Sequence, residues 1–170
     1  MSTNQRAQIT MTEAELAEFI EQQRTATIAT LGPTGFPHLV AMWYGVIDGQ
    51  IWIETKLKSQ KVTNLRRDDR ITCLIEDGLT YDTLRGVSIE GRATIIDDPD
   101  ALWSVGVSVF DRYMGAYTEE MRPIVETMLH KRVAVRIDVQ RVRSWDHRKL
   151  GMGAVPLGGS TAKYLPNAAI

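Results

Sequence analysis

Apolar and polar side chains alternate along several short segments of this 170-residue chain. The clearest run covers residues 85–96, where Val87 and Ile89 would face one side and Glu90 and Arg92 the other. A period of two residues is typical of a β-strand with one buried face, and that face must pack against a second layer. The alternation therefore constrains the chain to fold around a sheet with one apolar side.

Six segments are predicted to be strands, and the turns between them favour antiparallel pairing. The strongest turn signal is Asp48-Gly49, because both residues tolerate the left-handed backbone of a two-residue hairpin. A capping box at Thr12 and Glu15 and helical spacing of apolar residues predict helices around the strands. The strands are expected at 25–31, 37–47, 50–55, 71–75, 85–96 and 131–142, and the helices at 12–23, 59–67, 98–113 and 118–130. This order predicts an α+β protein built on a small six-stranded antiparallel barrel with flanking helices.

The composition excludes several classes of protein. Its 20 basic and 21 acidic residues give a net charge of −1, which argues against nucleic acid as the main partner. No apolar run approaches the ~20 residues of a membrane-spanning helix, and no secretory signal opens the chain. The single cysteine, Cys73, cannot form an internal disulfide. We therefore expect a cytoplasmic protein with a flexible N-terminus (1–11), one folded domain (12–150) and a C-terminal arm or tail (151–170).

Basic residues gather in two segments of the chain. Residues 56–70 carry six basic and two acidic residues, a net charge of +4, and residues 131–149 carry seven basic and two acidic residues, a net charge of +5. In a chain of net charge −1, such clustering favours a local anion site. A solvated helix face and polar strand flanks explain the same charges, so this alternative stays open.

The order of residues in the first basic segment is typical of a phosphate site. Thr55, Ser59 and Lys61 follow one another where a strand is expected to lead into a helix. There, free backbone amides, two hydroxyls and one or two ammonium groups can converge on a phosphate. The Gly-rich loop and the Gly-Lys-Ser/Thr ending of a P-loop are absent from the sequence.

Aromatic residues are expected beside this segment. Met42-Trp43-Tyr44 ends the part of the second strand that leads into the Asp48-Gly49 hairpin, so it could form a wall for a planar ring. Packing into the core is the commoner use of such side chains. Trp145 and Lys149 follow the last predicted strand, where they could reach a ligand or simply cap the barrel end.

No catalytic side chain is assigned from the sequence. It contains no Gly-x-Ser-x-Gly elbow, no Cys-x-x-Cys or His-Glu-x-x-His pair and no EF-hand loop, so neither a serine nucleophile nor a metal site is expected. Cys73 lies in an apolar strand and is interpreted as a structural thiol. If the protein is an enzyme, its reactive group is expected to come with a cofactor.

In this order, the segments resemble the pyridoxamine 5′-phosphate oxidase-like split-barrel superfamily over about residues 12–150. The pattern is most similar to the subgroup that binds the deazaflavin coenzyme F420 instead of FMN. The resemblance is carried by Thr25–Thr30, Gly35-Phe36-Pro37, Val40-Ala41-Met42-Trp43-Tyr44, Ile53-Glu54-Thr55, the Thr55/Ser59/Lys61 pattern, Asn64-Leu65-Arg66-Arg67-Asp68 with Arg70, Arg85-Gly86-Val87, Glu90-Gly91-Arg92-Ala93 and Ser144-Trp145-Asp146-x-x-Lys149-Leu150.

The resemblance implies a split β-barrel that forms a homodimer, with the cofactor ring at the subunit interface. The implied cofactor contacts are Thr55, Lys56, Lys58, Ser59 and Lys61 for the phosphate, Asn64 in support of the helix start, Met42, Trp43 and Tyr44 for the ring, and Trp145 and Lys149 from the second subunit.

The function that this resemblance implies is F420-dependent hydride transfer to or from a small unsaturated organic molecule. An FMN-dependent oxidoreductase of the same fold and a non-catalytic flavin- or deazaflavin-binding protein stay open as alternatives. The late arginine and histidine residues with which vitamin-oxidising members bind pyridoxamine phosphate are not found, which argues against vitamin B6 oxidation. Tyr44, Tyr81 or solvent could supply a proton.

Overall fold

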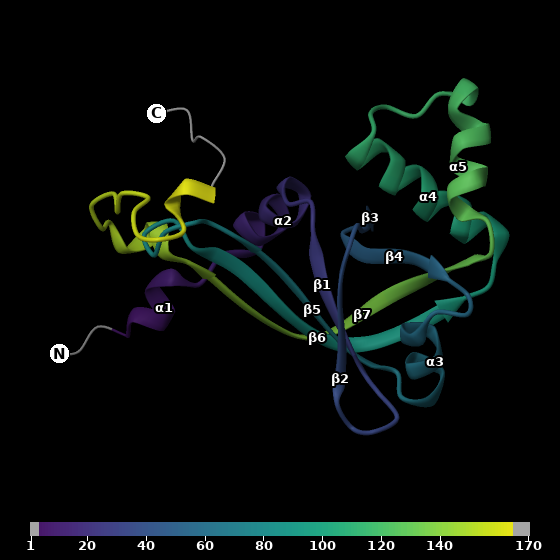
Figure 1. Cartoon of the computed structure of the whole chain (residues 1–170), viewed down its shortest axis with the longest axis horizontal. Helices are drawn as coiled ribbons and strands as arrows, with labels where there is room; N and C mark the ends of the chain where they lie inside the picture. The colour runs from purple at the N-terminus through teal and green to yellow at the C-terminus, as the bar shows by residue number, and fades with distance from the viewer. Residues whose placement is uncertain (1–3, 165–170) are drawn as a thin grey trace.

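The computed structural model describes residues 4–164, and one antiparallel sheet organises them (Figure 1). Seven strands pair in the order β2-β1-β5-β6-β7-β4-β3. The strands are β1 (Ala26–Leu31), β2 (Pro37–Met42), β3 (Gly45–Ile47), β4 (Gln50–Lys56), β5 (Arg70–Asp77), β6 (Arg85–Ile96) and β7 (Arg132–Asp146). The helices are α1 (Gln5–Ile9), α2 (Glu13–Gln22), α3 (Gln60–Arg67), α4 (Pro99–Tyr113) and α5 (Arg122–Leu129), with short 3-10 helices η1 (Glu119–Met121), η2 (His147–Leu150) and η3 (Ala162–Tyr164). The predicted α+β class and the antiparallel pairing are confirmed.

The prediction of six strands is wrong by one, because the expected strand 37–47 breaks at Trp43 and Tyr44. The first half, β2, forms one edge of the sheet, and the second half, β3, forms the other edge. Two residues thus connect opposite edges, so the sheet has to curl into a half-barrel. Tyr44 anchors this link, since its fully buried hydroxyl donates to the carbonyls of Ile20 at 2.6 Å and Gln23 at 3.0 Å.

Local sequence signals produce the expected local structures. Thr12 and Glu15 form both hydrogen bonds of a capping box at the start of α2. Asp48 and Gly49 adopt φ angles of 51° and 72° in the β3–β4 hairpin, as a two-residue turn with left-handed backbone requires. Pro123 lies in the first turn of α5, where a missing amide costs no hydrogen bond.

The last strand is longer than predicted, and it runs to Asp146 instead of residue 142. It continues because β6 is equally extended, and the pairing holds as far as Arg85 opposite Asp146. Trp145, expected beyond the barrel, therefore lies inside β7 opposite Gly86. A Cβ at Gly86 would lie 2.4 Å from the Trp145 ring, so the indole packs directly on glycine backbone.

Two layers of side chains cover the sheet. Inside the curl, apolar residues of β1, β5 and β6 pack with Phe19 of α2 and Leu65 of α3. On the far side of β3, β4 and β7, helices α4 and α5 bury Val105, Val109 and Val125. Figure 1 shows α3, α4 and α5 gathered at one end of the long axis, and α1 with the C-terminal segment at the other.

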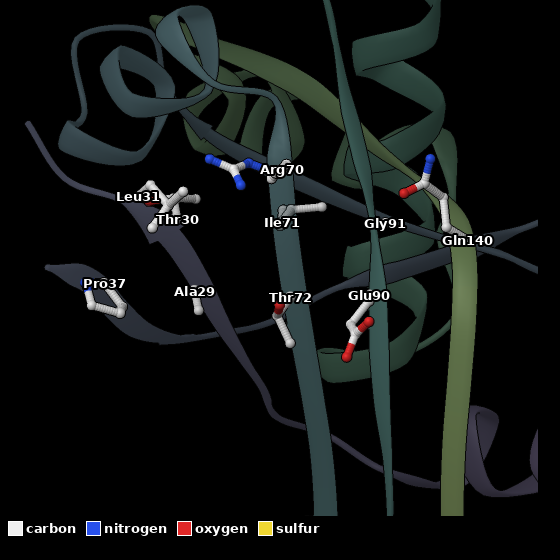
Figure 2. A pocket seen from close by; sticks show the side chains of 10 residues that line it. All are labelled: Ala29, Thr30, Leu31, Pro37, Arg70, Ile71, Thr72, Glu90, Gly91 and Gln140. Carbon is white, nitrogen blue, oxygen red and sulfur yellow. The ribbon is translucent and has the colours of Figure 1, made fainter. Parts of the chain in front are cut away.

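The outer face of β2, β1, β5 and β6 carries half-buried and exposed side chains. The strand register aligns Leu39, Ala29, Thr72 and Glu90 in one row across these strands. Figure 2 shows Ala29, Thr72 and Glu90 of this row in a hollow of about 340 Å³. We call this surface the outer face. Leu39 is 60% exposed there.

Both chain ends of the described part carry short helices. Residues 4–11, within the predicted flexible N-terminus, include α1, and the Met11 amide donates to the Ser144 hydroxyl at 3.1 Å. Residues 151–164, within the predicted arm, end in η3, and residues 1–3 and 165–170 lie outside the described part. The domain boundaries at 11 and 150 stay predictions. Among the helices described, none is long and apolar enough to cross a membrane.

Candidate functional site

A groove of about 440 Å³ opens where the ends of β2 and β4 meet the start of α3 and the start of β7. It contains six of the predicted cofactor contacts, which arrive from segments up to about twenty residues apart in the chain. The residues that line it are Val40, Ala41, Met42, Trp43, Glu54, Thr55, Lys56, Ser59, Lys61, Met114, Met128 and Arg132. The hollow on the outer face and another of about 470 Å³ between α4 and β3 include none of the predicted contacts.

The polar floor of the groove is built at the start of α3. Thr55 is the last but one residue of β4, Ser59 is the N-cap of α3, and their hydroxyl oxygens lie 3.4 Å apart. The Ser59 hydroxyl also accepts from the Val62 amide at 3.4 Å. Among the hydrogen bonds of residues 4–164, none engages the amides of Gln60 and Lys61, so the first turn of α3 has N–H groups to offer an anion.

Lys61 is the buried cation of this floor. It is 9% exposed, and no hydrogen bond or ion pair within the described residues holds its ammonium group. Burial lowers the pKa of Lys61, the positive charge of Arg132 lowers it further, and Glu54 opposes both effects. Lys56, by contrast, is exposed and donates to the carbonyl of His130 at 2.8 Å. A bound anion would therefore offset the cost of burying the charge of Lys61, and it would gain less from the exposed Lys56.

An ion pair forms the side of the groove next to Lys61. Arg132 begins β7, opposite Lys56 of β4, and its Nη1 donates to Oε2 of Glu54 at 2.5 Å. Burial raises the pKa of Glu54, although the guanidinium of Arg132 lowers it in part. The Nε atom of Arg132 is buried and has no hydrogen-bond partner in the described structure.

The rest of the groove lining is apolar and partly aromatic. Met42 ends β2, and Trp43 follows it in the link to β3. The indole of Trp43 is half-exposed and stacks on Tyr113, with ring centroids 4.4 Å apart and planes at 7°. Met114 and Met128 complete this part of the lining from the ends of α4 and α5. Thioether and indole groups offer a flat ligand contact without a directional bond.

Three other predicted contacts lie outside the groove lining. Tyr44 is buried in the core, and burial raises the pKa of its hydroxyl. Asn64 is fully buried on α3, where its amide donates to the Thr30 hydroxyl at 3.0 Å and supports the helix from behind. Lys58 is exposed in the turn before α3. Within one chain, Trp43 is therefore the aromatic residue of the groove. Tyr44 packs in the core, which the sequence had left open as the alternative to a ring contact.

Trp145 lies near the end of β7 and Lys149 in η2, which packs against α1, and Figure 1 shows α1 at the end of the long axis away from α3. Lys149 donates to the Thr10 carbonyl at 2.8 Å and pairs with Glu15 at 2.6 Å, so within one chain it fastens α2 to η2. Trp145 packs on Gly86. A single chain therefore does not bring these two residues to the groove.

Six residues of the groove lining were not among the predicted cofactor contacts, namely Val40, Ala41, Glu54, Met114, Met128 and Arg132. For Arg132 a signal existed, because it belongs to the second basic segment. Its position beside the first basic segment, however, follows from the pairing of β4 with β7. Nothing in the local sequence around Met114 and Met128 indicates a ligand contact, since both simply lie at the ends of helices.

The groove has the chemistry of a site for a flat ring with an attached phosphate. We call Thr55, Ser59, Lys61 and the first amides of α3 the phosphate corner. It supplies hydroxyl, amide and ammonium donors, and the uncommitted Lys61 suits an anion. Trp43 and Met42 supply a flat apolar wall beside it. Among the described residues, no cluster of histidine, cysteine and acidic side chains could hold a metal ion.

A family model and several solved structures match this chain. The family model for pyridoxamine 5′-phosphate oxidase matches residues 12–146. No curated protein sequence matches the chain. Among solved structures, a conserved hypothetical protein of Mycobacterium tuberculosis, Rv2991, is 62% identical, with a TM-score of 0.90 over 94% of this chain and 99% of that chain.

Two more distant structures share the fold. An F420 reductase is 22% identical, with a TM-score of 0.58 over 74% of this chain and 93% of that one. A FAD-binding protein of Mesorhizobium loti is 17% identical, with a TM-score of 0.58 over 79% of this chain and 94% of that one. The family match over most of the chain, together with the curled half-barrel and its groove, shows that the chain belongs to the pyridoxamine 5′-phosphate oxidase family.

Proposed function

We propose that this protein is an oxidoreductase that binds coenzyme F420 in the groove. It transfers a hydride between the deazaflavin and a small unsaturated organic substrate. The observation that carries the proposal is the meeting of the phosphate corner and the Trp43 wall in one groove. Membership of the family and the fold shared with an F420 reductase support it.

The side chains of the groove bind and orient the cofactor. Lys61, Ser59 and the amides of α3 hold its phosphate, and Met42 and Trp43 shield one side of the ring from water. When bound, the deazaflavin supplies the hydride chemistry. Tyr44 is unavailable as a proton donor, because its buried hydroxyl already donates to two carbonyls. Within one chain, Tyr81 packs on His147 of η2, with ring centroids 4.5 Å apart, and it does not line the groove. The proton then comes from solvent or from Tyr81 of a second copy.

An FMN-dependent oxidoreductase is the second candidate. The same groove would accept the phosphate and the ring of FMN, and the fold shared with a FAD-binding protein favours it. A protein that carries a flavin or deazaflavin without turnover is the third. The cytoplasm is the proposed location for all three, because a buried free thiol such as Cys73 suits a reducing compartment.

A homodimer is part of the proposal. The second copy would cover the outer face, where apolar side chains such as Leu39 and Leu31 lie unpaired with any helix. Trp145 and Lys149 of the second copy would then approach the groove. Since Lys149 is tied to Glu15 in one chain, dimerisation would have to replace or share that ion pair.

Titration of the purified protein with F420, and separately with FMN, tests the cofactor. We expect micromolar F420 binding, followed by fluorescence quenching, and weaker FMN binding. Oxidation of the reduced cofactor by a panel of enones and quinones then separates an enzyme from a carrier. Tight FMN binding would move the protein to the second candidate, and binding of neither cofactor would contradict the proposal.

A further inference from the structure

We propose that Glu54 selects the charge of the ligand that the groove accepts. It neutralises Arg132, so that Lys61 is the one buried cation presented to the ligand. The groove then prefers a phosphodiester, with one negative charge, over a phosphate monoester, with two. This inference rests on the proposed function, because it concerns the same groove.

The contacts of the cluster support this role for Glu54. Glu54 is 9% exposed, and its Oε2 lies 2.5 Å from Nη1 of Arg132, in direct ion-pair contact. Both residues line the groove with Lys61. A carboxylate at this position repels each negative charge of a ligand, and the repulsion is screened less than at the surface because Glu54 is largely buried. A second negative charge on the ligand is therefore repelled by Glu54, and the groove has no second free buried cation among the described residues to compensate for this repulsion.

The remaining cations near the groove contribute less. Lys56 is exposed, so solvent screens its charge, and its ammonium is held by the His130 carbonyl. Arg136, the next outward cation on the same face of β7, is paired with Asp138 at 2.6 Å. Lys61 alone combines burial with a free ammonium group among the described residues of the groove.

This selection separates the two candidate cofactors by chemistry. F420 carries its phosphate as a diester with one charge, whereas FMN carries a monoester whose second pKa is about 6, so it is a dianion at pH 8. Two flavins with the same ring but different phosphate charges allow the effect of charge to be measured separately from the effect of the ring. FMN and riboflavin 4′,5′-cyclic phosphate share one ring and one phosphorus atom, and they differ by one charge.

The experiment measures dissociation constants of riboflavin, FMN and the cyclic phosphate at pH 8 by flavin fluorescence. In the natural protein, we expect the cyclic phosphate to bind more tightly than FMN, and riboflavin to bind most weakly. In Glu54→Gln, the ratio of the two phosphate affinities should shift by about tenfold towards FMN, the scale of one charge across a few ångström in a partly desolvated site.

Two further variants separate charge from structure. Glu54→Gln/Arg132→Met removes both charges of the ion pair, so the preference for the cyclic phosphate should be retained. Glu13→Gln makes the same change in net charge on the exposed surface of α2, and it should leave the ratio within twofold. Should Glu54→Gln alone fail to fold, the double variant leaves no unpaired charge and still tests the proposal, because loss of the preference there would overturn it.

The failures of the two proposals have different signatures. If neither phosphate compound binds more tightly than riboflavin, the phosphate corner, and with it the proposed function, is contradicted. If both bind more tightly than riboflavin but the natural protein prefers FMN, or Glu54→Gln leaves the ratio unchanged, the cofactor site stands and the role of Glu54 is overturned.

Discussion

At the scale of single residues, Lys61 is the most unusual group in the molecule. A lysine seldom loses nearly all of its exposure without a partner, because the ammonium group is costly to remove from water. Its neighbours Thr55 and Ser59 donate or accept hydrogen bonds but carry no charge. The residue is therefore poised for an anion that enters the groove.

Replacement of Lys61 by alanine is expected to weaken cofactor binding by ~1.5–3 kcal/mol, the value of a hydrogen bond to a charged group. Isothermal titration with F420 checks this loss. Arg66→Ala removes an exposed cation of α3 outside the groove lining and outside the predicted contacts, and it should change the affinity little. Equal losses in the two variants would show that general charge, and not the position of Lys61, attracts the ligand.

Asp146 makes stability depend on pH in the acid range. Its carboxylate accepts from Nε and Nη2 of Arg148 at 2.8 Å and 2.6 Å, and these bonds hold its pKa below the usual value. The contribution is present above a pH of about 4, the ordinary pKa of an aspartate, and it is lost as the pH falls through the lower folded-state value.

Asp146→Asn is therefore expected to lower the free energy of unfolding at pH 7 by about 1–2 kcal/mol. Urea unfolding at pH 7 and at pH 3 measures the effect. The difference from the natural protein should shrink at the lower pH, because the aspartate of the unfolded chain takes up a proton there before the folded one does. A difference that is equal at both values would assign the loss to packing and not to the charge.

At the scale of secondary-structure elements, the β3–β4 hairpin fixes the site. Thr55 and Lys56 end β4, and β4 is aligned by its turn with β3 and by its other edge with β7. The edge of β3 is closed by α4, because the Ser108 hydroxyl bonds both the amide and the carbonyl of Val46. The contact between β3 and α4 therefore helps to fix the position of β4 and of the groove residues that β4 carries.

Gly49→Ala is expected to destabilise the protein by about 1 kcal/mol, because Gly49 has a φ of 72° and a left-handed backbone disfavours a Cβ. No atom lies within 4 Å of the added Cβ, so the cost is one of backbone conformation. Chemical denaturation measures it. Gly153→Ala, also without a neighbour within 4 Å and outside the left-handed region, should have little effect.

At the scale of the whole molecule, the helices within residues 4–164 pack elsewhere and leave the outer face of the sheet uncovered. The outer face brings Leu39 and Leu31 of adjacent strands beside Glu90 and Arg70 across the sheet. Apolar side chains next to charges of both signs suit contact with a symmetry-related copy of the same surface. The proposed dimer would bury this surface.

Leu39→Asp is expected to convert a dimer into a monomer, because an isologous contact would bury two new unpaired carboxylates. Sedimentation velocity over a range of concentrations measures the change. Leu79→Asp, in the loop before β6, alters an equally exposed leucine outside the outer face and should leave the assembly intact. A monomer in the natural protein would contradict the dimer, and a dimer that tolerates Leu39→Asp would move the interface elsewhere.

Features that depend on neighbouring residues followed from the sequence by itself. The capping box at Thr12, the turn at Asp48-Gly49 and the start of a helix near Ser59 each need only a few consecutive residues. The alternation along 85–96 likewise fixed β6 because one strand determines which of its own side chains share a face. These signals were enough for the α+β class and for the core of the phosphate corner.

Tertiary structure decided what depends on distant partners. The break at Trp43 and Tyr44 arises because the two halves of that segment pair with different strands, and the extension of β7 to Asp146 arises because β6 continues beside it. Arg132 meets Glu54 across 78 positions in the chain through the β4–β7 register. Strand register and burial are properties of the packed molecule, so no local pattern could give the charge balance that surrounds Lys61.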